Sequence, residues 1–334
     1  MKILGIGRAL PPQVVTNQQL EQILDTTDEW IQSRTGIKER HILNGGTVAG
    51  LALEAGREAL QDAGLQGSDL DLIFVTTAQG DDLFPSVSCS IQQDLGADCP
   101  CMDLHAACAG FVYALDTADA YIKSGKARNI LIVSAEALSR VSDWSDRSTC
   151  VLFGDAAAAV VVGPGEGLLS CQLSALSRRE ILFGTYIGLP CPFSPPEQKV
   201  APGIRMEGQE VFKFAVGASA ADLQKAAEMA GTTIAQVDWV LLHQANRRII
   251  DAVSRRLGAA PGHVPSNIHR MGNTSSASIP LLMYDLYHAG LLEPGHLLAL
   301  SGFGSGMTSG ACVIRWDKPK PENLQDPADT LLFT

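Results

Sequence analysis

The sequence predicts an α/β protein built from two halves that follow one plan. Strands alternate with helices along the 334 residues, which is typical of layered α/β folds. Two stretches about half a chain apart repeat the order helix, strand, helix, buried turn, helix, strand. The apolar strands in both stretches are nearly continuous, so we expect them to be buried on both faces of their sheets.

The first repeated elements are a helix that ends at a glycine and a buried strand that follows it. In the first half these elements are residues 53–64 and 71–77, and in the second half they are residues 221–231 and 238–243. The matching order predicts that the two halves have the same connectivity.

The next repeated elements are a second helix and a final strand. The second helix ends near Gly96 in the first half and near Gly258 in the second, and each glycine is suited to cap the end of a helix. Apolar strands follow later in each half, at residues 129–134 and 296–301.

Between these elements lies a third helix, which begins after a turn of small residues. We expect it to run from Cys108 to Gly125 in the first half and from Asn273 to Gly290 in the second, because both starts and both ends are separated by the same number of positions. If the halves pack about a pseudo-twofold axis, Cys108 and Asn273 would occupy equivalent places near that axis, where a shared site would form.

We divide the chain into residues 1–170 and residues 171–334. The second part contains a segment rich in proline and glycine, residues 177–209, which we predict to be a surface loop placed to cover a substrate tunnel. The tail from Asp317 onward is proline-rich and charged, so we expect it to add little to the fold.

Composition excludes several classes of function. A net charge of −11 argues against general binding to nucleic acid, because phosphate binding needs a basic surface. No apolar stretch is long enough for a signal peptide or a membrane span, so we expect a soluble, cytoplasmic protein. The eight cysteines lack zinc-ligand spacing, which predicts mostly buried thiols and no metal site. Gly5 and Gly7 lack the third glycine of a dinucleotide-binding turn.

Cys108 is a candidate nucleophile. It lies among alanines and a glycine, and a helix is predicted to begin at once. Helix amides and the positive end of the helix dipole stabilise an anion, so we expect this setting to favour the thiolate. The plainer interpretation of any single cysteine is a buried structural thiol.

His243 and Asn273 are candidate partners of Cys108. His243 ends an apolar strand, where a titratable ring leaves the core, although a satisfied core histidine is the plainer interpretation. Asn273 lies in a polar turn before a helix, where a helix cap is the ordinary explanation. The three residues together are more specific than any one of them.

Six motifs, in order along the chain, resemble those of β-ketoacyl-acyl-carrier-protein synthase III. The matching segments are residues 28–31 with 34–37, 106–111, 146–149 with 153–155, 206–213, 243–246 and 272–277. The resemblance covers residues 1–316. It implies a thiolase-like fold, in which two duplicated αβαβα halves form a five-layered core.

The resemblance also implies a two-step reaction. Cys108 takes an acyl group from a coenzyme A thioester, and malonyl-acyl-carrier-protein then loses carbon dioxide and attacks the acyl-Cys108 to begin fatty-acid elongation. The family forms its oxyanion hole from two backbone N–H groups, which correspond here to Cys108 and Ser305. His243 and Asn273 would stabilise the enolate oxygen. Coenzyme A enters as a substrate thioester, and no cofactor is implied.

Further residues carry over from the family by position. Those expected to bind coenzyme A are Trp30, Arg34, Arg147, Asn246 and Arg248. Those expected to dock the acidic carrier protein are Lys213, Arg248, Arg255 and Arg256, and those expected to line the tunnel are Phe84, Phe303 and Met307. The resemblance implies a homodimer that extends a central sheet and places Phe84 in the partner's tunnel. For each residue alone, ordinary packing or a solvated surface charge is the plainer interpretation.

Two rival interpretations remain open at this point. A specialised relative in secondary metabolism would use the same residues to load an aromatic or branched acyl group, and a non-catalytic subunit would bind acyl-coenzyme A without turnover. A thiolase is disfavoured because residues 302–310 contain no second cysteine. His105 and the segment 307–310 depart from common family members, which leaves the choice of primer open.

Overall fold

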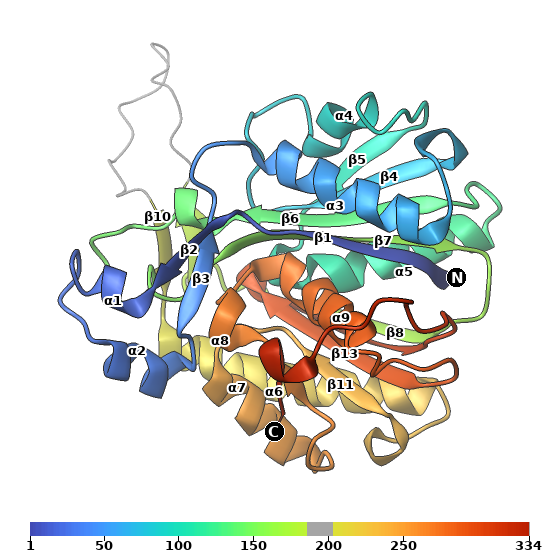
Figure 1. The fold of residues 1–334 in the computed structure, drawn as a ribbon. Coiled ribbons are helices and arrows are strands. Elements are labelled where there is room, and N and C mark those ends of the chain that lie inside the picture. The colour runs from blue at the N-terminus through green and yellow to red at the C-terminus, as the bar shows by residue number, and fades with distance from the viewer. Residues whose placement is uncertain (186–202, 334) are drawn as a thin grey trace.

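The structure, a computed structural model, describes residues 1–185 and 203–333. Two sheets and three layers of helices stack in the order helix, sheet, helix, sheet, helix (Figure 1). This arrangement confirms the predicted five-layered α/β fold.

The first sheet comes from the N-terminal half and has five strands. Its order is β1 (Lys2–Ala9), β7 (Asp155–Gly163), β6 (Ile130–Ala137), β4 (Leu72–Thr76) and β5 (Cys101–Leu104). The β1–β7 and β7–β6 pairs are antiparallel, and the β6–β4 and β4–β5 pairs are parallel. Every residue of β4, β6 and β7 is buried, as their continuous apolar sequences predict.

The second sheet comes from the C-terminal half and repeats this pattern. Its order is β8 (Leu168–Ala175), β14 (Thr308–Arg315), β13 (Leu297–Gly304) and β11 (Trp239–Leu242). The first two pairs are antiparallel and the last is parallel, so β8, β14, β13 and β11 correspond to β1, β7, β6 and β4. The division predicted at residue 170 falls inside β8.

Three layers of helices cover and separate the sheets. The outer faces carry α3 (Val48–Ala63) with α4 (Val87–Gln92), and α6 (Gly208–Met229) with α7 (Arg247–Leu257). The middle layer holds α5 (Gly110–Lys123) and α9 (Ser278–His288), whose apolar side chains join both sheets in one core. Gly5 and Gly7 of β1 lie against the backbone of α3, so a side chain there would force the layers apart.

Several helix starts differ from the predicted ones. The helix predicted from residue 53 begins at Val48, because Thr47 caps it by accepting the N–H of Gly50 at 2.9 Å. The helix predicted from residue 221 begins at Gly208, inside the segment predicted to be a loop. Both glycine ends predicted for the second helices are present, with Gly96 and Gly258 in the left-handed region.

The turns before the middle helices correct the predicted correspondence between the halves. A 3₁₀ turn at Ala107–Ala109 precedes α5, and a 3₁₀ turn at Ser275–Ala277 precedes α9. Ala107 and Ser275 share a rare left-handed φ, 48° and 49°. Cys108 therefore corresponds to Ser276, and Asn273 lies three residues earlier. The prediction was wrong because α9 is shorter than α5 while their terminal glycines stay aligned.

Smaller elements surround one end of the sheets. The pair β2 (Gln13–Thr16) and β3 (Glu39–Ile42) lies beside α1 (Asn17–Leu20), α2 (Asp28–Thr35) and α8 (Ile268–Met271). The buried Arg40 of β3 donates to the carbonyl groups of Val15 and Val151 and to Asn17 Oδ1. Arg40 thereby ties this region to the loop that leads into β7.

The segment predicted to cover the site is in part a two-stranded ribbon. Strands β9 (Leu182–Thr185) and β10 (Gly203–Met206) pair antiparallel over the cavity described below. The rest of the predicted loop, residues 186–202, lies outside the described residues, and so does Cys191. Of the described cysteines, Cys99, Cys150 and Cys312 are buried free thiols, whereas Cys89 is exposed.

The tail takes part in the fold, so the expectation that it adds little was wrong. Its last strand β15 (Leu332–Phe333) pairs with β12 (Pro265–Ser266), and Phe333 contacts the ring of Trp239. Leu331 is 3% exposed and belongs to the core between the two sheets. Burial of one leucine outweighs the proline-rich composition around it.

We expect Leu331→Ala to lower the free energy of unfolding by about 3 kcal/mol, because it leaves a cavity in the central core. Its neighbour Leu332 is exposed, so Leu332→Ala is a matched control with an expected change below about 0.5 kcal/mol. Denaturant unfolding followed by circular dichroism measures both. Equal stability of the two variants would contradict this account of the tail.

Candidate active site

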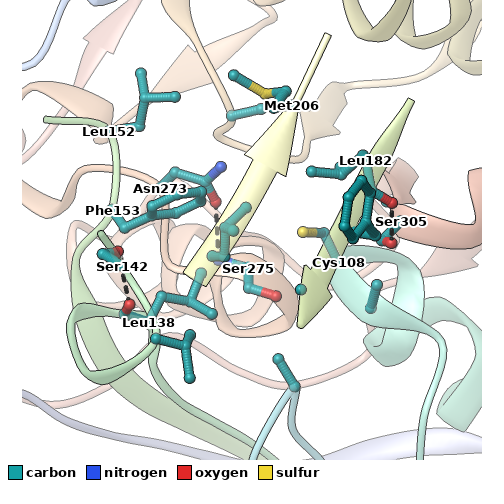
Figure 2. Close-up of a pocket in the computed structure, with 18 of the residues that line it drawn as sticks. Cys108, Leu138, Ser142, Leu152, Phe153, Leu182, Met206, Asn273, Ser275 and Ser305 are labelled. Atoms are coloured by element: carbon teal, nitrogen blue, oxygen red, sulfur yellow. Dashed lines mark hydrogen bonds between the residues drawn. The ribbon is translucent and has the colours of Figure 1, made fainter. Parts of the chain in front are cut away.

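The candidate residues from the two halves meet in one cavity of about 2150 Å³. Cys108, His243 and Asn273 all line it, so the structure brings together the three residues that the sequence singled out. The ribbon of β9 and β10 passes in front of them, and Leu182 and Met206 point toward the pocket (Figure 2). Apolar side chains therefore form part of the cavity wall above these three residues.

Cys108 lies in the 3₁₀ turn between β5 and α5. Gly304 of β13 packs directly on this turn, where an added Cβ would lie 2.5 Å from Cys108 N. The Thr308 hydroxyl donates to the carbonyl group of Ala106 at 2.9 Å. These contacts attach the nucleophile's turn to the second sheet.

The thiol of Cys108 differs from the prediction. Burial, with a smaller contribution from the carboxylate of Glu136, raises its pKa to about 12, while the Ser275 side chain acts in the opposite direction. The expectation of a favoured thiolate was therefore wrong for the resting protein. The reason lies outside the local sequence. Desolvation and the carboxylate of Glu136 raise the pKa of Cys108 by more than the amides at the start of the helix lower it. A proton must leave Cys108 before it attacks.

His243 sits where β11 ends, and its ring is a neutral hydrogen-bond donor. Its Nδ1 lies 2.6 Å from Ser278 Oγ, which also accepts the backbone N–H of Gln244 at 3.2 Å. We assign the hydroxyl hydrogen of Ser278 to Nδ1, and with this assignment the ring proton lies on Nε2. Burial lowers the pKa of His243 to about 3, so the ring stays uncharged at neutral pH.

Asn273 is held by its backbone and by its own turn. Its N–H donates to the carbonyl group of Leu152 at 2.8 Å, and its carbonyl accepts the N–H of Gly154 at 3.0 Å. Its Oδ1 accepts the N–H of Ser275 at 2.9 Å (Figure 2). Because Oδ1 is occupied, the Nδ2 hydrogens are the groups of this side chain that remain to bind a ligand.

Ser305, predicted for the oxyanion hole, lies on the cavity wall with Cys108. Its hydroxyl donates to the carbonyl group of Leu182 at 2.6 Å, which joins it to the β9 strand. Gly306 follows with a φ of 104°, a conformation that favours glycine and lets the chain turn sharply after Ser305. The arrangement fits a role for the backbone of Ser305, since its side chain is already engaged.

The residues predicted to bind coenzyme A gather at the outer part of the cavity. The guanidinium carbons of Arg34 and Arg147 lie 5.8 and 5.3 Å from the centre of the Trp30 ring. Trp30, Arg34, Asn246 and Arg248 line the cavity, whereas Arg147 does not and instead contacts Asp25. Asn246 also caps α7 by accepting the N–H of Arg248 at 2.9 Å. An aromatic ring between two guanidinium groups suits a nucleotide base and its phosphates.

The predicted docking residues divide between the cavity and the surface. Lys213 and Arg248 line the cavity, and Lys213 pairs with Glu210 at 2.6 Å. Arg255 and Arg256 are exposed in the last turn of α7, away from the cavity lining. Arg248, Arg255 and Arg256 thus extend from the cavity along α7 to the surface, while Lys213 lies on α6.

The tunnel predictions have mixed outcomes. Phe303 lines the cavity, and its ring centre lies 5.1 Å from that of His243. Met307 is buried in a hydrophobic cluster under the second sheet and does not line the cavity, so this part of the prediction was wrong. Phe84 is 79% exposed and does not line the cavity of its own chain. Its predicted place in a partner's tunnel stays a prediction.

Three residues that the sequence reasoning missed complete the site. Ser278 contacts the ring of His243, Ser275 donates its N–H to Asn273, and the buried Glu136 accepts the hydroxyl of Ser276 close to Cys108. The available signal was the set of hydroxyl side chains that follows Asn273, at residues 274, 275, 276 and 278. No local signal marks Glu136, whose strand brings it to the site.

Among the residues that the structure describes, no helix is both long and apolar enough to cross a lipid bilayer.

Comparisons with known proteins agree with this site. Residues 102–177 match the family described as 3-oxoacyl-[acyl-carrier-protein] synthase III, and residues 227–316 match its C-terminal part. The chain is 45% identical to β-ketoacyl-[acyl-carrier-protein] synthase III of Neisseria meningitidis over 94% of this chain and 99% of the relative.

Solved structures give the same result. The 3-oxoacyl-[acyl-carrier-protein] synthase III of Aquifex aeolicus superposes with a TM-score of 0.88 at 42% identity, covering 94% of this chain and 99% of the other. A priming β-ketosynthase of the R1128 polyketide pathway superposes with a TM-score of 0.88 at 33% identity, covering 95% and 96%. With Cys108 in the first matched segment and His243 and Asn273 in the second, the chain belongs to the 3-oxoacyl-[acyl-carrier-protein] synthase III family.

Proposed function

We propose that this protein condenses an acyl-coenzyme A primer with malonyl-acyl-carrier-protein through an acyl-Cys108 intermediate, and so starts fatty-acid chains. One observation carries the proposal: a thiol and two neutral hydrogen-bond donors, Cys108, His243 and Asn273, line one cavity. A nucleophile beside preorganised donors is what acyl transfer and carbanion formation require.

In the first step Cys108 Sγ forms a bond to the primer's carbonyl carbon, and the bond from that carbon to the sulfur of coenzyme A breaks. Negative charge develops on the carbonyl oxygen. The backbone N–H groups of Cys108 and Ser305, on adjoining turns held together by Gly304, are the proposed donors to it. Trp30 with Arg34 and Arg147 supplies the proposed cradle for the nucleotide of coenzyme A.

In the second step the malonyl thioester loses carbon dioxide, and its electrons pass to the thioester oxygen as an enolate. Nε2–H of His243 and Nδ2–H of Asn273 are the proposed donors to that oxygen. A ring with a pKa of about 3 donates its hydrogen bond without giving up the proton. The enolate carbon then bonds to the acyl carbon. The bond from that carbon to Cys108 Sγ breaks, which releases Cys108 as a thiolate.

The partners follow from these substrates. The cations Lys213, Arg248, Arg255 and Arg256 are proposed to attract the acidic carrier protein. A homodimer is proposed across β5, which is the edge strand of the first sheet and lies near the exposed Leu83 and Phe84. A cytoplasmic location suits a protein that uses coenzyme A esters and carrier protein.

The specialised relative has one point of support, the similar priming β-ketosynthase of the R1128 polyketide pathway at 33% identity, whereas the β-ketoacyl-[acyl-carrier-protein] synthase III of Neisseria meningitidis is 45% identical. Intact Cys108, His243 and Asn273 in one cavity oppose a subunit that binds without turnover. The specialised relative would need a primer pocket of distinct chemistry, and the choice of primer is what the following experiment measures.

Intact-protein mass spectrometry tests the proposal. The protein is incubated with acetyl-, branched, longer and aromatic acyl-coenzyme A in turn, and malonyl-acyl-carrier-protein is then added. We expect one acyl adduct that is lost in Cys108→Ala and discharged as a β-ketoacyl product. Preference for acetyl or short branched primers supports fatty-acid initiation, and an aromatic primer supports the specialised relative. No adduct with any primer would overturn the catalytic proposal.

A further inference from the structure

The hydroxyl of Ser305 joins the turn proposed for the oxyanion hole to the ribbon of β9 and β10. Its Oγ donates to the carbonyl group of Leu182 at 2.6 Å (Figure 2). The same turn lies against the nucleophile, because Gly304 packs directly on the backbone of Cys108. Ser305 is therefore a link between the turn of Cys108 and the ribbon that crosses the cavity.

The register of the ribbon explains why the carbonyl group of Leu182 is available to Ser305. Leu182 pairs with Met206. In the adjoining pair, the N–H of Glu207 donates to the carbonyl group of Ile181 at 2.8 Å. Hydrogen-bonded and non-hydrogen-bonded pairs alternate along an antiparallel ladder, so Leu182 and Met206 form a non-hydrogen-bonded pair. The carbonyl group of Leu182 therefore points away from β10, toward Ser305.

The opposite edge of the ribbon is fixed to the first half of the chain. The N–H of Ile204 donates to the carbonyl group of Val141 at 3.2 Å, and Arg205 pairs with Asp143 at 3.1 Å. A two-stranded ribbon is marginally stable by itself, so contacts of this kind decide where it lies. The ribbon thus crosses the cavity with one anchor in each half, and Ser305 supplies the anchor in the second half.

Leu182 forms part of the apolar wall beside Cys108. Its side chain packs against the hydrophobic cluster under the second sheet and against the cluster that contains Leu138, Leu152 and Phe153. These four apolar residues line the cavity, and Figure 2 shows them around the pocket that contains Cys108. An acyl chain bonded to Cys108 Sγ would extend among them, because they offer it apolar surface. The position of Leu182 then limits the length of chain that fits this primer pocket.

We propose that the Ser305 hydroxyl, acting through Leu182, sets the depth of the primer pocket and so favours short acyl primers. The proposal rests on the proposed function, because it concerns the primer of the acylation step. The bond from Ser305 to Leu182 holds the wall close to the turn of Cys108. When that bond is lost, the β9 edge can move outward and the pocket accepts a longer chain. In this role Ser305 is a positioning residue, and the role is separate from that of its backbone N–H.

The expected effect is moderate because other bonds also hold the chain before β9. The N–H of Arg178 donates to the carbonyl group of Gly306 at 3.3 Å, and the N–H of Leu176 donates to that of Met307 at 3.0 Å. These bonds remain in Ser305→Ala, so the variant should fold. It loses one hydrogen bond, which corresponds to a change of about fivefold in an equilibrium.

The test compares acylation of Cys108 by acetyl-, butyryl-, hexanoyl- and octanoyl-coenzyme A. The second-order rate constant of each acylation is measured as release of coenzyme A, and the ratio of the octanoyl to the acetyl value is the readout. We expect this ratio to rise about fivefold in Ser305→Ala. A shift of the Ser305 backbone would change the rates of all primers alike, so the ratio isolates the depth of the pocket.

Ser142→Ala is the matched control. Its hydroxyl donates to the carbonyl group of another leucine of the wall, Leu138, at 2.8 Å. That carbonyl group also accepts the N–H of Val141 at 3.2 Å, so the backbone of Leu138 stays held when the hydroxyl is removed. We expect the octanoyl-to-acetyl ratio of Ser142→Ala to equal that of the unaltered protein.

Leu182→Ala shows whether Ser305 acts through Leu182. It removes the side chain of the wall itself, so it should raise the octanoyl-to-acetyl ratio at least as much as Ser305→Ala does. If the hydroxyl acts only by placing this side chain, the double variant should have the same ratio as Leu182→Ala. Two independent effects would multiply instead.

Amide hydrogen exchange of the resting protein tests the anchor without any substrate. Ser305→Ala should exchange faster than the unaltered protein across residues 181–185 and 203–206, and Ser142→Ala should not. Unchanged exchange, an unchanged ratio in Ser305→Ala, or multiplied effects in the double variant would overturn the proposal. If the unaltered protein takes no acyl group from any primer, the proposed function fails and the role in primer length fails with it, whereas the exchange rates still show whether Ser305 anchors the ribbon.

Discussion

His243→Ala and Asn273→Ala are expected to lower the rate of condensation about a hundredfold or more while leaving acylation of Cys108 in place. Each variant removes one donor to the enolate oxygen, and the loss of one preorganised donor typically costs this much. Single-turnover experiments with pre-acylated protein and malonyl-acyl-carrier-protein separate the two steps.

Asn273→Asp is the informative companion of Asn273→Ala. It keeps an oxygen that accepts the N–H of Ser275 and replaces only the donating nitrogen. We expect it to be as poor in condensation as Asn273→Ala, because the donor is what matters. Full activity of Asn273→Asp would show that Asn273 serves only to shape its turn.

The condensation step also has an expected pH dependence. Because the pKa of His243 is about 3, its ring stays neutral at pH values well above 3, and condensation by pre-acylated protein should be flat from pH 5 to 8. An acid limb near pH 6.5 in this half-reaction would contradict the neutral donor.

Gly304→Ala is expected to reduce acylation of Cys108 about a hundredfold. The new Cβ would lie 2.5 Å from Cys108 N and 3.0 Å from Ala107 Cβ, and neither atom belongs to a flexible side chain. The turn that carries Cys108 must therefore move away from Ser305, and a displacement of about 1 Å at a reacting group costs about this factor. Stopped-flow release of coenzyme A measures the acylation rate.

Gly217→Ala provides the matched control for Gly304→Ala. Gly217 lies within α6, and an added Cβ there meets nothing within 4 Å. We expect unchanged acylation and a gain in stability of about 0.5–1 kcal/mol, because alanine is the better helix former. Normal acylation in Gly304→Ala would show that the turn adapts without cost.

The fold could be predicted from short stretches of sequence because those stretches form the strands and helix ends that they indicate. Continuous apolar stretches became the buried strands β4 and β6, and glycines ended helices where expected. Local signals failed where a distant part of the chain decides the outcome. Packing of Leu331 in the core orders the tail. The start of α9 is shifted by the turn Ser275–Ala277, which corresponds to the turn of Cys108 in the first half.

The site shows the same division. Motifs located Cys108, His243 and Asn273, because each follows or precedes a recognisable strand or helix. The protonation of Cys108 was predicted in the wrong direction, because it depends on burial and on Glu136, which is distant in sequence. Met307 was misplaced because one residue of difference in a tight turn decides which face a side chain takes.

The matching left-handed turns at Ala107 and Ser275 determine how many acyl groups one chain is expected to hold. The two halves present the same backbone conformation at the same point, but only the first carries a thiol there, since Ser276 stands where Cys108 would be repeated. An active-site titration should therefore saturate at one acyl group per chain. In place of a second thiol, the second turn presents the hydroxyl of Ser276, which donates to the buried Glu136.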